Sequence, residues 1–246
     1  VNNMDTTLYT TKEIEETMRL ATVGQIPTSK GSLEIVHISE GGYQPELEAF
    51  RRLRTNILAA NTNDASKTIV MTSAERGEGK STIISNLAVS IAQSGRRVLV
   101  VDCDMRLPTI HKLFDLPNER GLTDVIVDNV PFDKVVHTTK FSRVQVLTSG
   151  PLPPNPTELL DSPQMRELMS KLRDEYDIVL FDTPALLSVT DAAVLVPHVD
   201  RVVMVVAQTL SRRDAVLSVR QQLDTVNAKS IGIVVNRVPQ NGKLAY

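Results

Sequence analysis

TIVMTSAERGEGKST, residues 68–82, is the stretch of sequence that decides the fold. It opens with an apolar, β-branched run typical of a buried strand and continues into a glycine-rich turn that ends in Lys80 and Ser81. The turn matches the phosphate-loop pattern G-x-x-x-x-G-K-[ST] except at its first position, where Ala74 still meets the need for a small residue. An apolar stripe at helical spacing follows and is closed by Gly95, so a strand, a loop and a helix stand in the order that this motif requires.

The loop contains the residue types that hold a phosphate chain and its metal. Gly77 and Gly79 allow the backbone to turn its N–H groups toward an anion, and the N-terminus of the following helix faces the same point. The Lys80 ammonium can reach the β- and γ-phosphates of a nucleotide, and the Ser81 hydroxyl can coordinate Mg²⁺. We therefore predict a site for ATP and Mg²⁺. Its loop residues are Gly77, Glu78, Gly79, Lys80, Ser81 and Thr82.

The rest of the chain alternates between strand and helix patterns. Runs such as VLVV, IVLF and VVMVV are apolar on both faces, which favours strands covered by helices on both sides and hence a mostly parallel sheet. The predicted fold class is α/β, with the architecture of a P-loop nucleotide-binding domain. Strands are predicted at 68–72, 97–101, 144–147, 178–181, 201–206 and 231–235, and helices at about 46–60, 81–94, 157–174 and 212–227.

Two segments of different composition divide the chain. Residues 1–45 combine a short helix pattern over 11–18, with Thr11 as its N-cap, and a stretch rich in glycine and proline that has the composition of a linker. Residues 46–246 hold all the other patterns and form the predicted main domain. The first helix of this domain follows directly after Pro45 and carries apolar residues at helical spacing.

Two buried strand patterns end in carboxylates. The first ends in Asp102, with Asp104 two residues on, and the second ends in Asp182. Ligands of open parallel sheets lie beyond the carboxyl ends of the strands, so we expect these carboxylates beside the phosphate loop. The first two share a face in extended chain and can serve as metal ligand or general base, whereas the third can hold Mg²⁺ through water. An isolated Asp at a strand end is otherwise typical of a turn or a helix cap. The candidate metal ligands are Ser81, Asp102 and Asp182, and the candidate catalytic residues are Lys80, Asp102 and Asp104.

Four further residues near these motifs have roles that the residue types leave open. Arg106 can pair with Asp104 or with a phosphate group. Cys103 lies between the two aspartates and has the character of a small buried side chain. Asn236 and Arg237 follow the last strand pattern, where an Asn amide can read an adenine edge through one donor and one acceptor or can take part in a simple turn. We include both as predicted nucleotide contacts.

The composition excludes several classes of protein. In 246 residues, 27 Lys and Arg against 29 Asp and Glu give a net charge of −2, which argues against nucleic acid as a partner. Aromatic residues are only 4%, with no Trp, which argues against a surface that stacks bases. A single cysteine excludes a disulfide framework and a cysteine-based zinc site, and it favours a reducing compartment.

The sequence shows neither a membrane-spanning pattern nor a secretory one. No apolar run reaches the roughly 18 residues that span a bilayer, and no signal segment opens the sequence. Residue 1 is Val rather than Met, so we expect that the chain is a fragment with further sequence ahead of it.

These motifs resemble those of the bacterial tyrosine kinases that control capsular and exopolysaccharide synthesis. SAERGEGKST resembles the Walker A motif of that family, and VLVVDCDMR resembles its additional Walker A′ motif. IVLFDTPA resembles its Walker B motif, with Ala185 where a second proline is frequent. TSGPLPPNPTELLDS resembles a further segment typical of the family. The resemblance covers about residues 4–240, which is nearly the whole chain.

The resemblance implies a P-loop fold of the deviant Walker, or MinD-like, type and a tyrosine autokinase activity. Mg·ATP would lie on the phosphate loop, Asp102 or Asp104 would accept the proton of the tyrosine hydroxyl, and the acceptor would come from another subunit. Glu48, Arg51 and Arg54 match the family's E-x-x-R-x-x-R oligomerisation motif, and their spacing puts the three charges near one helix face. We therefore expect a ring-like homo-oligomer. The alternative for this helix is a solvated charged face.

The resemblance also implies partners and a location. Residues 1–45 look like the juxtamembrane stretch of family members in which a membrane-spanning, regulator-like half is fused ahead of the kinase. We therefore expect a membrane activator, a cognate tyrosine phosphatase and a position at the cytoplasmic face of the membrane. Family members usually carry a C-terminal tyrosine cluster, which in this chain is either cut off or absent, and Tyr246 is the candidate phosphoacceptor. The tyrosines are Tyr9, Tyr43, Tyr176 and Tyr246.

Two other functions compete with the kinase. Partitioning or septum-site ATPases of the same superfamily use the nucleotide to switch dimerisation and transfer the phosphoryl group to water. They carry a second lysine early in the phosphate loop, where this chain has Glu75 and Arg76. A nucleotide-gated assembly component without kinase activity would fit the missing tyrosine cluster. Incubation with ATP and Mg²⁺, followed by detection of phosphotyrosine, separates the three functions.

Overall fold

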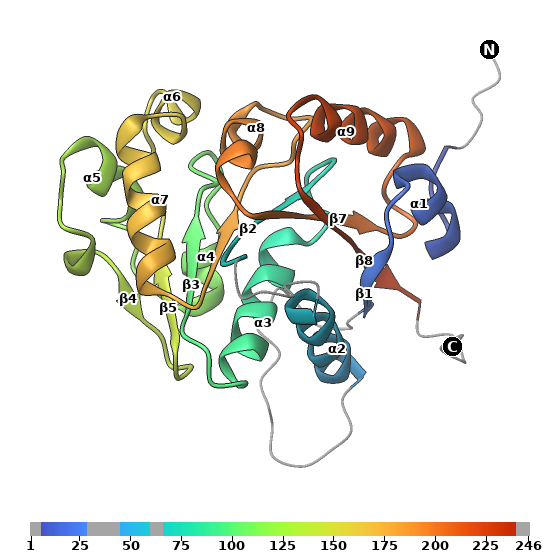
Figure 1. Cartoon of the computed structure of the whole chain (residues 1–246), viewed down its shortest axis with the longest axis horizontal. Helices are drawn as coiled ribbons and strands as arrows, with labels where there is room; N and C mark the ends of the chain where they lie inside the picture. Colours follow the sequence, from blue (N-terminus) through green and yellow to red (C-terminus); the bar gives the residue numbers. More distant parts are fainter. Residues whose placement is uncertain (1–5, 29–44, 60–65, 240–246) are drawn as a thin grey trace.

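The structure, a computed structural model, describes residues 6–28, 45–59 and 66–239. Within these residues the backbone forms one sheet of eight strands in the order β1-β8-β7-β2-β6-β3-β5-β4 (Figure 1). Neighbouring strands run parallel, except that β4 and β5 are antiparallel. The strands are β1 Thr22–Pro27, β2 Thr68–Ser73, β3 Val98–Asp102, β4 His137–Thr138, β5 Val144–Leu147, β6 Ile178–Asp182, β7 Arg201–Ala207 and β8 Ser230–Val238.

The central strands β2, β3 and β6 are buried along their whole length. Each contains a run of at least three consecutive apolar residues, without the polar alternation of a strand that has one face in water. Such strands are stable only when helices cover both faces of the sheet. This arrangement confirms the predicted α/β class and its mostly parallel sheet.

Helices cover the two faces and enclose a core on each (Figure 1). One face is covered by α2 Pro45–Ala59, α3 Lys80–Ala92 and α4 Ile110–Phe114. The other face is covered by α1 Thr11–Met18, α5 Leu122–Val127, α6 Pro156–Leu160, α7 Pro163–Glu175, α8 Asp191–Leu195 and α9 Arg213–Thr225. Two short 3₁₀ helices are η1 Phe132–Lys134 and η2 Val196–His198. Because the strands are parallel, β2, β3 and β6 end at one edge of the sheet, and the residues that follow them meet there.

The helix predicted over 157–174 is in fact two helices, α6 and α7. The break follows Asp161, where Ser162 takes up the N-cap position and its hydroxyl accepts the Met165 N–H at 3.1 Å. Pro163 occupies the first turn of α7, where the missing N–H costs nothing. The apolar periodicity is similar on both sides of the break, and the local capping residues decide where the helix stops.

α1 begins one residue away from the predicted cap. Thr10, not Thr11, is the N-cap: its hydroxyl accepts the Glu13 N–H at 3.2 Å, while the Glu13 carboxylate accepts the Thr10 N–H at 3.0 Å. This reciprocal capping box satisfies two N–H groups, whereas Thr11 as the cap would pair with no Glu or Gln at the corresponding position. Sequence alone could have selected Thr10 on this ground.

The described part of residues 1–45 belongs to the body of the domain rather than to a linker. β1 pairs with β8 in the sheet, and α1 packs beside α9, so the boundary predicted at residue 45 is wrong for residues 6–28. Gly24 misled the prediction because a Cβ there would lie 2.8 Å from Leu53 of α2, so this glycine serves close packing and not flexibility. The juxtamembrane role of this segment stays a prediction.

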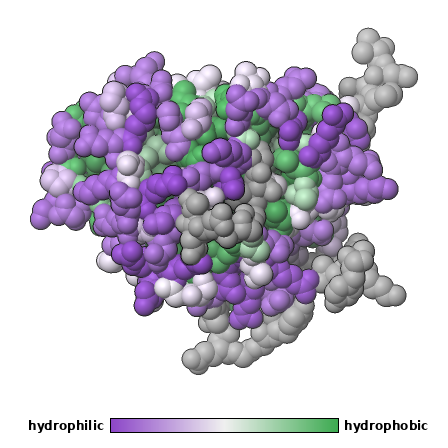
Figure 2. Space-filling model, in the orientation of Figure 1, coloured by the Kyte–Doolittle hydropathy of each residue, from purple (hydrophilic) through white to green (hydrophobic). Residues whose placement is uncertain are grey.

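The surface carries ordinary features of a globular domain. Figure 2 shows one face as mostly hydrophilic, with smaller hydrophobic areas toward its upper half.

Among the helices that the structure describes, none has the length and apolar character needed to cross a bilayer. Cys103 is fully buried, as predicted.

Candidate nucleotide-binding and phosphoryl-transfer site

The phosphate loop, residues 74–79, joins the end of β2 to the start of α3. Gly77 and Gly79 adopt φ angles of +82° and +93°, the left-handed region that favours glycine. α3 begins at Lys80, and the Ile83 N–H donates to the Gly79 carbonyl at 3.0 Å. The N-terminus of a helix of 13 residues therefore opens onto the loop, which is the arrangement that attracts an anion.

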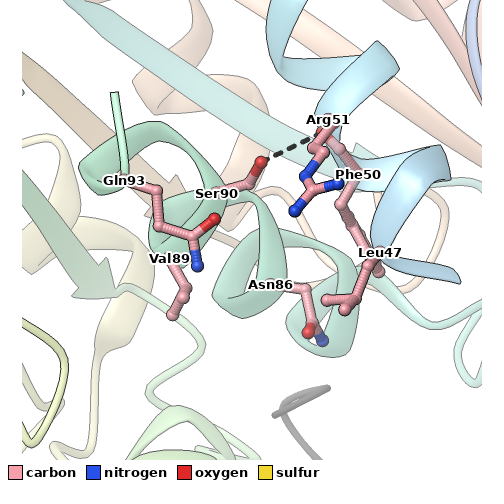
Figure 3. Close-up of a pocket in the computed structure, with 7 residues that line it drawn as sticks. All are labelled: Leu47, Phe50, Arg51, Asn86, Val89, Ser90 and Gln93. Atoms are coloured by element: carbon pink, nitrogen blue, oxygen red, sulfur yellow. Dashed lines mark hydrogen bonds between the residues drawn. The ribbon is translucent and has the colours of Figure 1, made fainter. Parts of the chain in front are cut away.

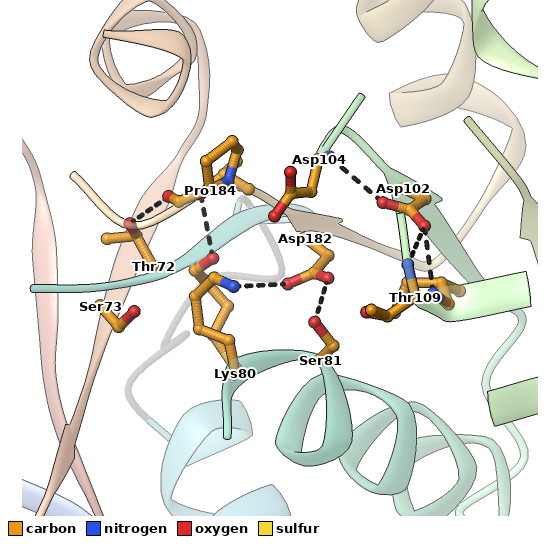
Figure 4. Close-up of polar contacts among 12 residues, drawn as sticks. Thr72, Ser73, Lys80, Ser81, Asp102, Asp104, Thr109, Asp182 and Pro184 are labelled. Atoms are coloured by element: carbon orange, nitrogen blue, oxygen red, sulfur yellow. Dashed lines mark hydrogen bonds and ion pairs between the residues drawn. The ribbon is translucent and has the colours of Figure 1, made fainter. Parts of the chain in front are cut away.

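Lys80 and Ser81 converge on the buried carboxylate of Asp182 (Figure 4). The Lys80 ammonium lies 3.8 Å from Asp182 Oδ1, and the Ser81 hydroxyl donates to Asp182 Oδ2 at 2.6 Å. The Asp182 side chain is fully buried, whereas that of Lys80 is 12% exposed. The structure thus brings together three residues that the sequence placed on two separate motifs.

Asp102 ends β3 and lies beside Asp182 in the register of β3 and β6. Its Oδ2 accepts the N–H groups of Thr109 and Ile110 at 3.2 and 3.1 Å, and its Oδ1 accepts the Asp104 N–H at 3.2 Å. These contacts hold the turn after β3 and the start of α4. The capping role that the sequence left open for Asp102 is therefore present, and the side chain is fully buried.

Asp104 differs from Asp102 because it is half-buried. One of its carboxylate oxygens accepts the Leu107 N–H at 3.0 Å. Figure 4 shows Asp104 between Asp102 and Pro184, with Lys80 and Asp182 below it in this view. Of the two predicted general-base candidates, Asp104 is the one that an incoming hydroxyl group can approach.

Burial changes the acid strength of the two buried carboxyl groups. Burial first, and then the neighbouring Asp182 carboxylate, raises the pKa of Asp102 well above its usual range. Burial also raises the pKa of Asp182, while the charge of Lys80 and the Ser81 hydrogen bond oppose that rise. A divalent cation near both groups would favour their ionised forms.

The donor atoms beside the loop fit Mg²⁺. Asp182 Oδ1 is buried and accepts no hydrogen bond from the described residues, and the Ser81 hydroxyl lies on the other oxygen of the same carboxylate. No group of three or more His, Cys, Asp or Glu side chains with metal-binding geometry occurs in residues 6–28, 45–59 and 66–239. Mg²⁺ usually takes one or two protein oxygens and completes its shell with phosphate and water, so this sparse set suits it.

Glu78 is part of the phosphate loop, and its side chain is buried. The carboxylate accepts the Glu75 N–H at 2.9 Å and also contacts the Ser211 hydroxyl. Burial raises its pKa, and the hydrogen bond from Ser211 opposes the rise. The part of Glu78 that can bind a phosphate is therefore its backbone N–H group and not its carboxylate.

Asn236 and Arg237 reach the phosphate loop from the end of β8. The Asn236 amide donates to the Glu78 carbonyl at 2.7 Å, and the Arg237 guanidinium donates to the Gly77 carbonyl at 2.6 Å. Direct contact of either residue with a nucleotide stays a prediction. Thr82, another predicted contact, lies in the first turn of α3. Its hydroxyl is buried and forms no hydrogen bond with the described residues.

Arg106 does not pair with Asp104, one of the two partners predicted for it. Its guanidinium forms two hydrogen bonds with Asp191 of α8, at 2.9 and 3.1 Å, and its contact with a phosphate stays a prediction. The Thr157 hydroxyl of α6 donates to the same buried carboxylate at 2.5 Å. Arg106 thereby connects the loops that follow three neighbouring strands, β3, β5 and β6. An uncompensated Asp191 would be costly at this depth, which explains the choice of partner.

The three motif residues on α2 do not share one environment. Glu48 pairs with Arg51 and with Arg52 at 3.6 Å each, on the exposed side of the helix. Arg54 donates to the Ser90 carbonyl of α3 at 2.9 Å, and a common face of the three charges stays a prediction. Oligomerisation itself stays a prediction.

A shallow pocket lies between α2 and α3 next to these residues (Figure 3). The Ser90 hydroxyl donates to the Phe50 carbonyl at 3.2 Å across the floor of the contact. Figure 3 shows Arg51 directed over the pocket toward Ser90 and Asn86. The lining residues are Leu47, Phe50, Arg51, Asn86, Val89, Ser90 and Gln93.

Sequence reasoning missed Ser211 and Asp191, and it could not place Tyr246. Ser211 lies in the connection between β7 and α9, where no motif marks it. Asp191 begins a helix of five residues, too short for a periodic signal, although a Thr-Asp pair after the Walker B-like stretch indicates a helix start. Tyr246, the predicted phosphoacceptor, lies outside the described residues.

Comparisons with known proteins give one consistent group. The family model described as an AAA domain matches residues 66–230. The tyrosine-protein kinase YwqD of Bacillus subtilis is 41% identical over 189 residues, which cover 77% of this chain and 80% of the relative. The solved kinase domain of the Escherichia coli tyrosine kinase ETK superposes with a TM-score of 0.85 at 30% identity, over 96% of this chain and 98% of that one.

A more distant solved structure shows the wider fold. The cell division ATPase MinD of Pyrococcus furiosus is similar with a TM-score of 0.61 and 26% identity, over 70% of this chain and 72% of that one. Both coverage and superposition are lower than for the kinase domain. This confirms the predicted MinD-like P-loop architecture.

Proposed function

This chain belongs to the family of bacterial tyrosine-protein kinases, and on that premise we propose that it phosphorylates tyrosines of a neighbouring copy of itself with Mg·ATP. The family membership makes it an enzyme of the tyrosine kinase class. The nucleotide, the metal and the acceptor in a second copy are the parts that we propose. One observation carries the proposal, namely the convergence of Lys80 and Ser81 on the buried Asp182 beneath the phosphate loop.

Lys80 and Ser81 have different roles at the phosphate chain, because one binds phosphate oxygens and the other would hold Mg²⁺. Lys80 is tethered by Asp182 at the start of α3, from which its ammonium can bind the β- and γ-phosphate oxygens as a point charge. The Ser81 hydroxyl and the Asp182 carboxylate are the groups that would hold Mg²⁺, which neutralises charge on the phosphates when it is bound. The N–H groups of the loop complete the anion site.

Asp104 is the group that we expect to take the proton. The acceptor oxygen forms a new bond to the γ-phosphorus, the bond from that phosphorus to the oxygen bridging to the β-phosphate breaks, and ADP leaves. The hydroxyl proton passes to the Asp104 carboxylate, which is only half-buried and so remains accessible to the hydroxyl group. Asp102 is less suited because it is fully buried and already accepts three N–H groups.

The wider setting of the reaction is proposed on the resemblance of the motifs. We propose that the phosphorylation regulates capsule or exopolysaccharide synthesis and export. A membrane activator, with a position at the cytoplasmic face of the membrane, and a tyrosine phosphatase that reverses the reaction complete the system. Assembly into a ring-like homo-oligomer through the exposed Glu48 and Arg51 of α2 would bring acceptor tyrosines to neighbouring sites.

The test uses the whole chain, ATP, Mg²⁺ and an added tyrosine peptide from a family tyrosine cluster. Phosphotyrosine on the peptide is the expected product, and the Lys80→Met variant should give none. ATP hydrolysis by wild type without any labelled tyrosine, even with a membrane activator present, would support the partitioning-type ATPase instead. Nucleotide binding with neither hydrolysis nor labelling would support a nucleotide-gated assembly component.

A further inference from the structure

Two carbonyl oxygens of the phosphate loop accept hydrogen bonds from residues at the end of β8. Asn236 Nδ2 donates to the Glu78 carbonyl at 2.7 Å, and Arg237 Nη2 donates to the Gly77 carbonyl at 2.6 Å. Both donors come from the end of β8, and Asn236 is itself fixed by its pairing with Ala207 in β7. Two successive peptide groups of the loop are therefore oriented by one neighbouring strand.

The orientation of these carbonyl groups fixes the direction of the N–H groups. In a trans peptide the C=O and N–H bonds point in opposite directions. With the carbonyls of Gly77 and Glu78 bound to β8, the N–H groups of Glu78 and Gly79 point away from β8. These N–H groups are the ones that a phosphate-binding loop directs at its anion.

The backbone is adapted on both sides of this contact. Arg237 has a φ of +57°, a left-handed conformation that a β-strand residue other than glycine or asparagine rarely adopts. A Cβ on Gly79 would lie 2.2 Å from Asn236 Nδ2, so the loop must have glycine there for the amide to reach its carbonyl. Unusual backbone of this kind persists where the surrounding structure imposes it, and it gathers at functional sites.

A third anchor comes from the loop's own side chain. The buried Glu78 carboxylate accepts the Glu75 N–H at 2.9 Å and contacts the Ser211 hydroxyl. The Ser211 hydroxyl in turn accepts the Ala207 N–H at 2.9 Å, so this anchor also ends on the strand pair of β7 and β8. The loop is thus fixed at two carbonyl oxygens and one carboxylate before any ligand arrives.

We propose that Asn236 and Arg237 are positioning residues that set the phosphate-binding conformation of the loop, and that they act on the phosphates and not on the nucleotide base. The inference rests on the proposed nucleotide site. It differs from the sequence-based hypothesis, in which the Asn236 amide reads the adenine edge. The two hypotheses make opposite predictions for a ligand that has a phosphate chain and no base.

The first experiment compares Mg·ATP with Mg·tripolyphosphate as ligands of the whole chain, measured by calorimetry. Asn236→Ala removes the donor to the Glu78 carbonyl, and we expect the affinities for both ligands to fall by a similar factor, about tenfold. If the variant loses affinity for Mg·ATP and keeps that for Mg·tripolyphosphate, Asn236 reads the base and the inference is overturned.

The second experiment separates positioning from stability. Arg237→Gly removes the guanidinium and at the same time relieves the left-handed backbone, so we expect an unchanged or raised thermal midpoint together with an affinity about tenfold lower for both ligands. A residue that only stabilised the fold would not show this opposite behaviour. Full affinity in Arg237→Gly would overturn the inference.

Arg143→Gly is the matched control. Arg143 is exposed, has a φ of +66° and precedes β5, which lies next to the edge strand β4 on the other side of the sheet from β8. The same chemical change there should alter stability in the same direction and leave both affinities at the wild-type value. A loss of affinity in this control equal to that in Arg237→Gly would mean that the effect is not local, which overturns the inference.

The outcomes also distinguish the inference from the proposed function. Lys80→Met should lose both ligands, because it removes the charge on the phosphates. If wild type binds and Lys80→Met does not, while the Asn236 and Arg237 variants bind as wild type, the inference alone fails. A wild-type chain that binds neither ligand would overturn both the nucleotide site and the inference.

Discussion

Asp102 and Asp182 lie side by side at the ends of β3 and β6, as partners in the strand register, and both side chains are fully buried. Two carboxyl groups at this depth disfavour each other's ionisation, and burial adds to the effect. Among the described residues, Lys80 forms an ion pair with Asp182, and no cationic side chain forms one with Asp102. A cation bound between the two carboxyl groups would therefore favour the ionised form of both.

This pair predicts an unusual pH dependence of stability in EDTA. Burial raises the pKa of Asp102 well above its usual 3.8, so the native state holds this proton more tightly than the unfolded state. The contribution to stability is fully present below the unfolded pKa and is lost as the pH rises through the folded pKa. We expect the wild-type free energy of unfolding, relative to that of Asp102→Asn, to fall as the pH is raised from about 4 upward.

Urea unfolding of both proteins across this range checks the prediction. Subtracting the variant removes the contributions of all other titrating groups, and Asp133→Asn at an exposed position serves as the control. A difference between wild type and Asp102→Asn that stays constant with pH would mean that Asp102 ionises as it does in an unfolded chain.

Asp182→Asn should raise the Mg²⁺ requirement. The carboxylate carries the Ser81 hydrogen bond on one oxygen and leaves the other without one, and an amide is a weaker ligand for a hard cation. Saturating Mg²⁺ should restore a large part of the kinase rate, because the phosphate loop itself is unchanged. Initial rates measured against Mg²⁺ concentration test this, and a variant with the wild-type Mg²⁺ midpoint would contradict it.

Asp104→Asn should lower tyrosine phosphorylation about a hundredfold, the usual scale for the loss of a general base. The asparagine oxygen can still accept the Leu107 N–H, so the thermal midpoint should stay close to that of wild type. Initial rates on an added tyrosine peptide and calorimetric melting measure the two effects. A wild-type rate would show that the proton goes elsewhere.

Arg54→Ala should destabilise the monomer, whereas Arg51→Ala should not. Arg54 donates to the Ser90 carbonyl in the last turn of α3, where the Ser94 N–H bonds to Ile91 instead, so the carbonyl needs another donor. We expect a loss of about 1 kcal/mol in the free energy of unfolding.

The exposed pair on α2 provides the contrast. The double variant Glu48→Ala, Arg51→Ala removes a surface ion pair, so the stability of the monomer should not change. Because the same two residues are proposed to contact a neighbouring subunit, the variant should dissociate an oligomer. Light scattering combined with denaturant unfolding separates the two effects. Equal losses of stability from Arg54→Ala and from the double variant would contradict the assignment.

The fold was largely predictable because its strands are long apolar runs between periodic helices. β3 and β6 read as buried strands from residues such as Val100 and Leu180 alone. β1 was not predictable, since Gly24 and Pro27 have the local character of a linker. Its place is set by packing against Leu53 and by pairing with β8, which are contacts across the fold that no local pattern encodes.

The candidate site divides in the same way. Lys80, Ser81 and Asp182 lie in short motifs whose chemistry is readable from residue type and spacing. The partners of Arg106 and Glu78 could not be predicted, because they lie far away along the chain. Asp191 is 85 residues from Arg106, and Ser211 is 133 residues from Glu78. Which buried carboxylate meets which donor depends on how the loops pack.

The pairing of β1 with β8 has a practical consequence for anyone who shortens this protein. Removal of the residues before Pro45 would turn β8 from an interior strand into an edge strand and would leave its N–H and C=O groups on that side without partners. Such an edge is a template for strand addition by other molecules and promotes aggregation. A truncated protein that keeps the residues from Thr6 onward retains the strand that protects this edge.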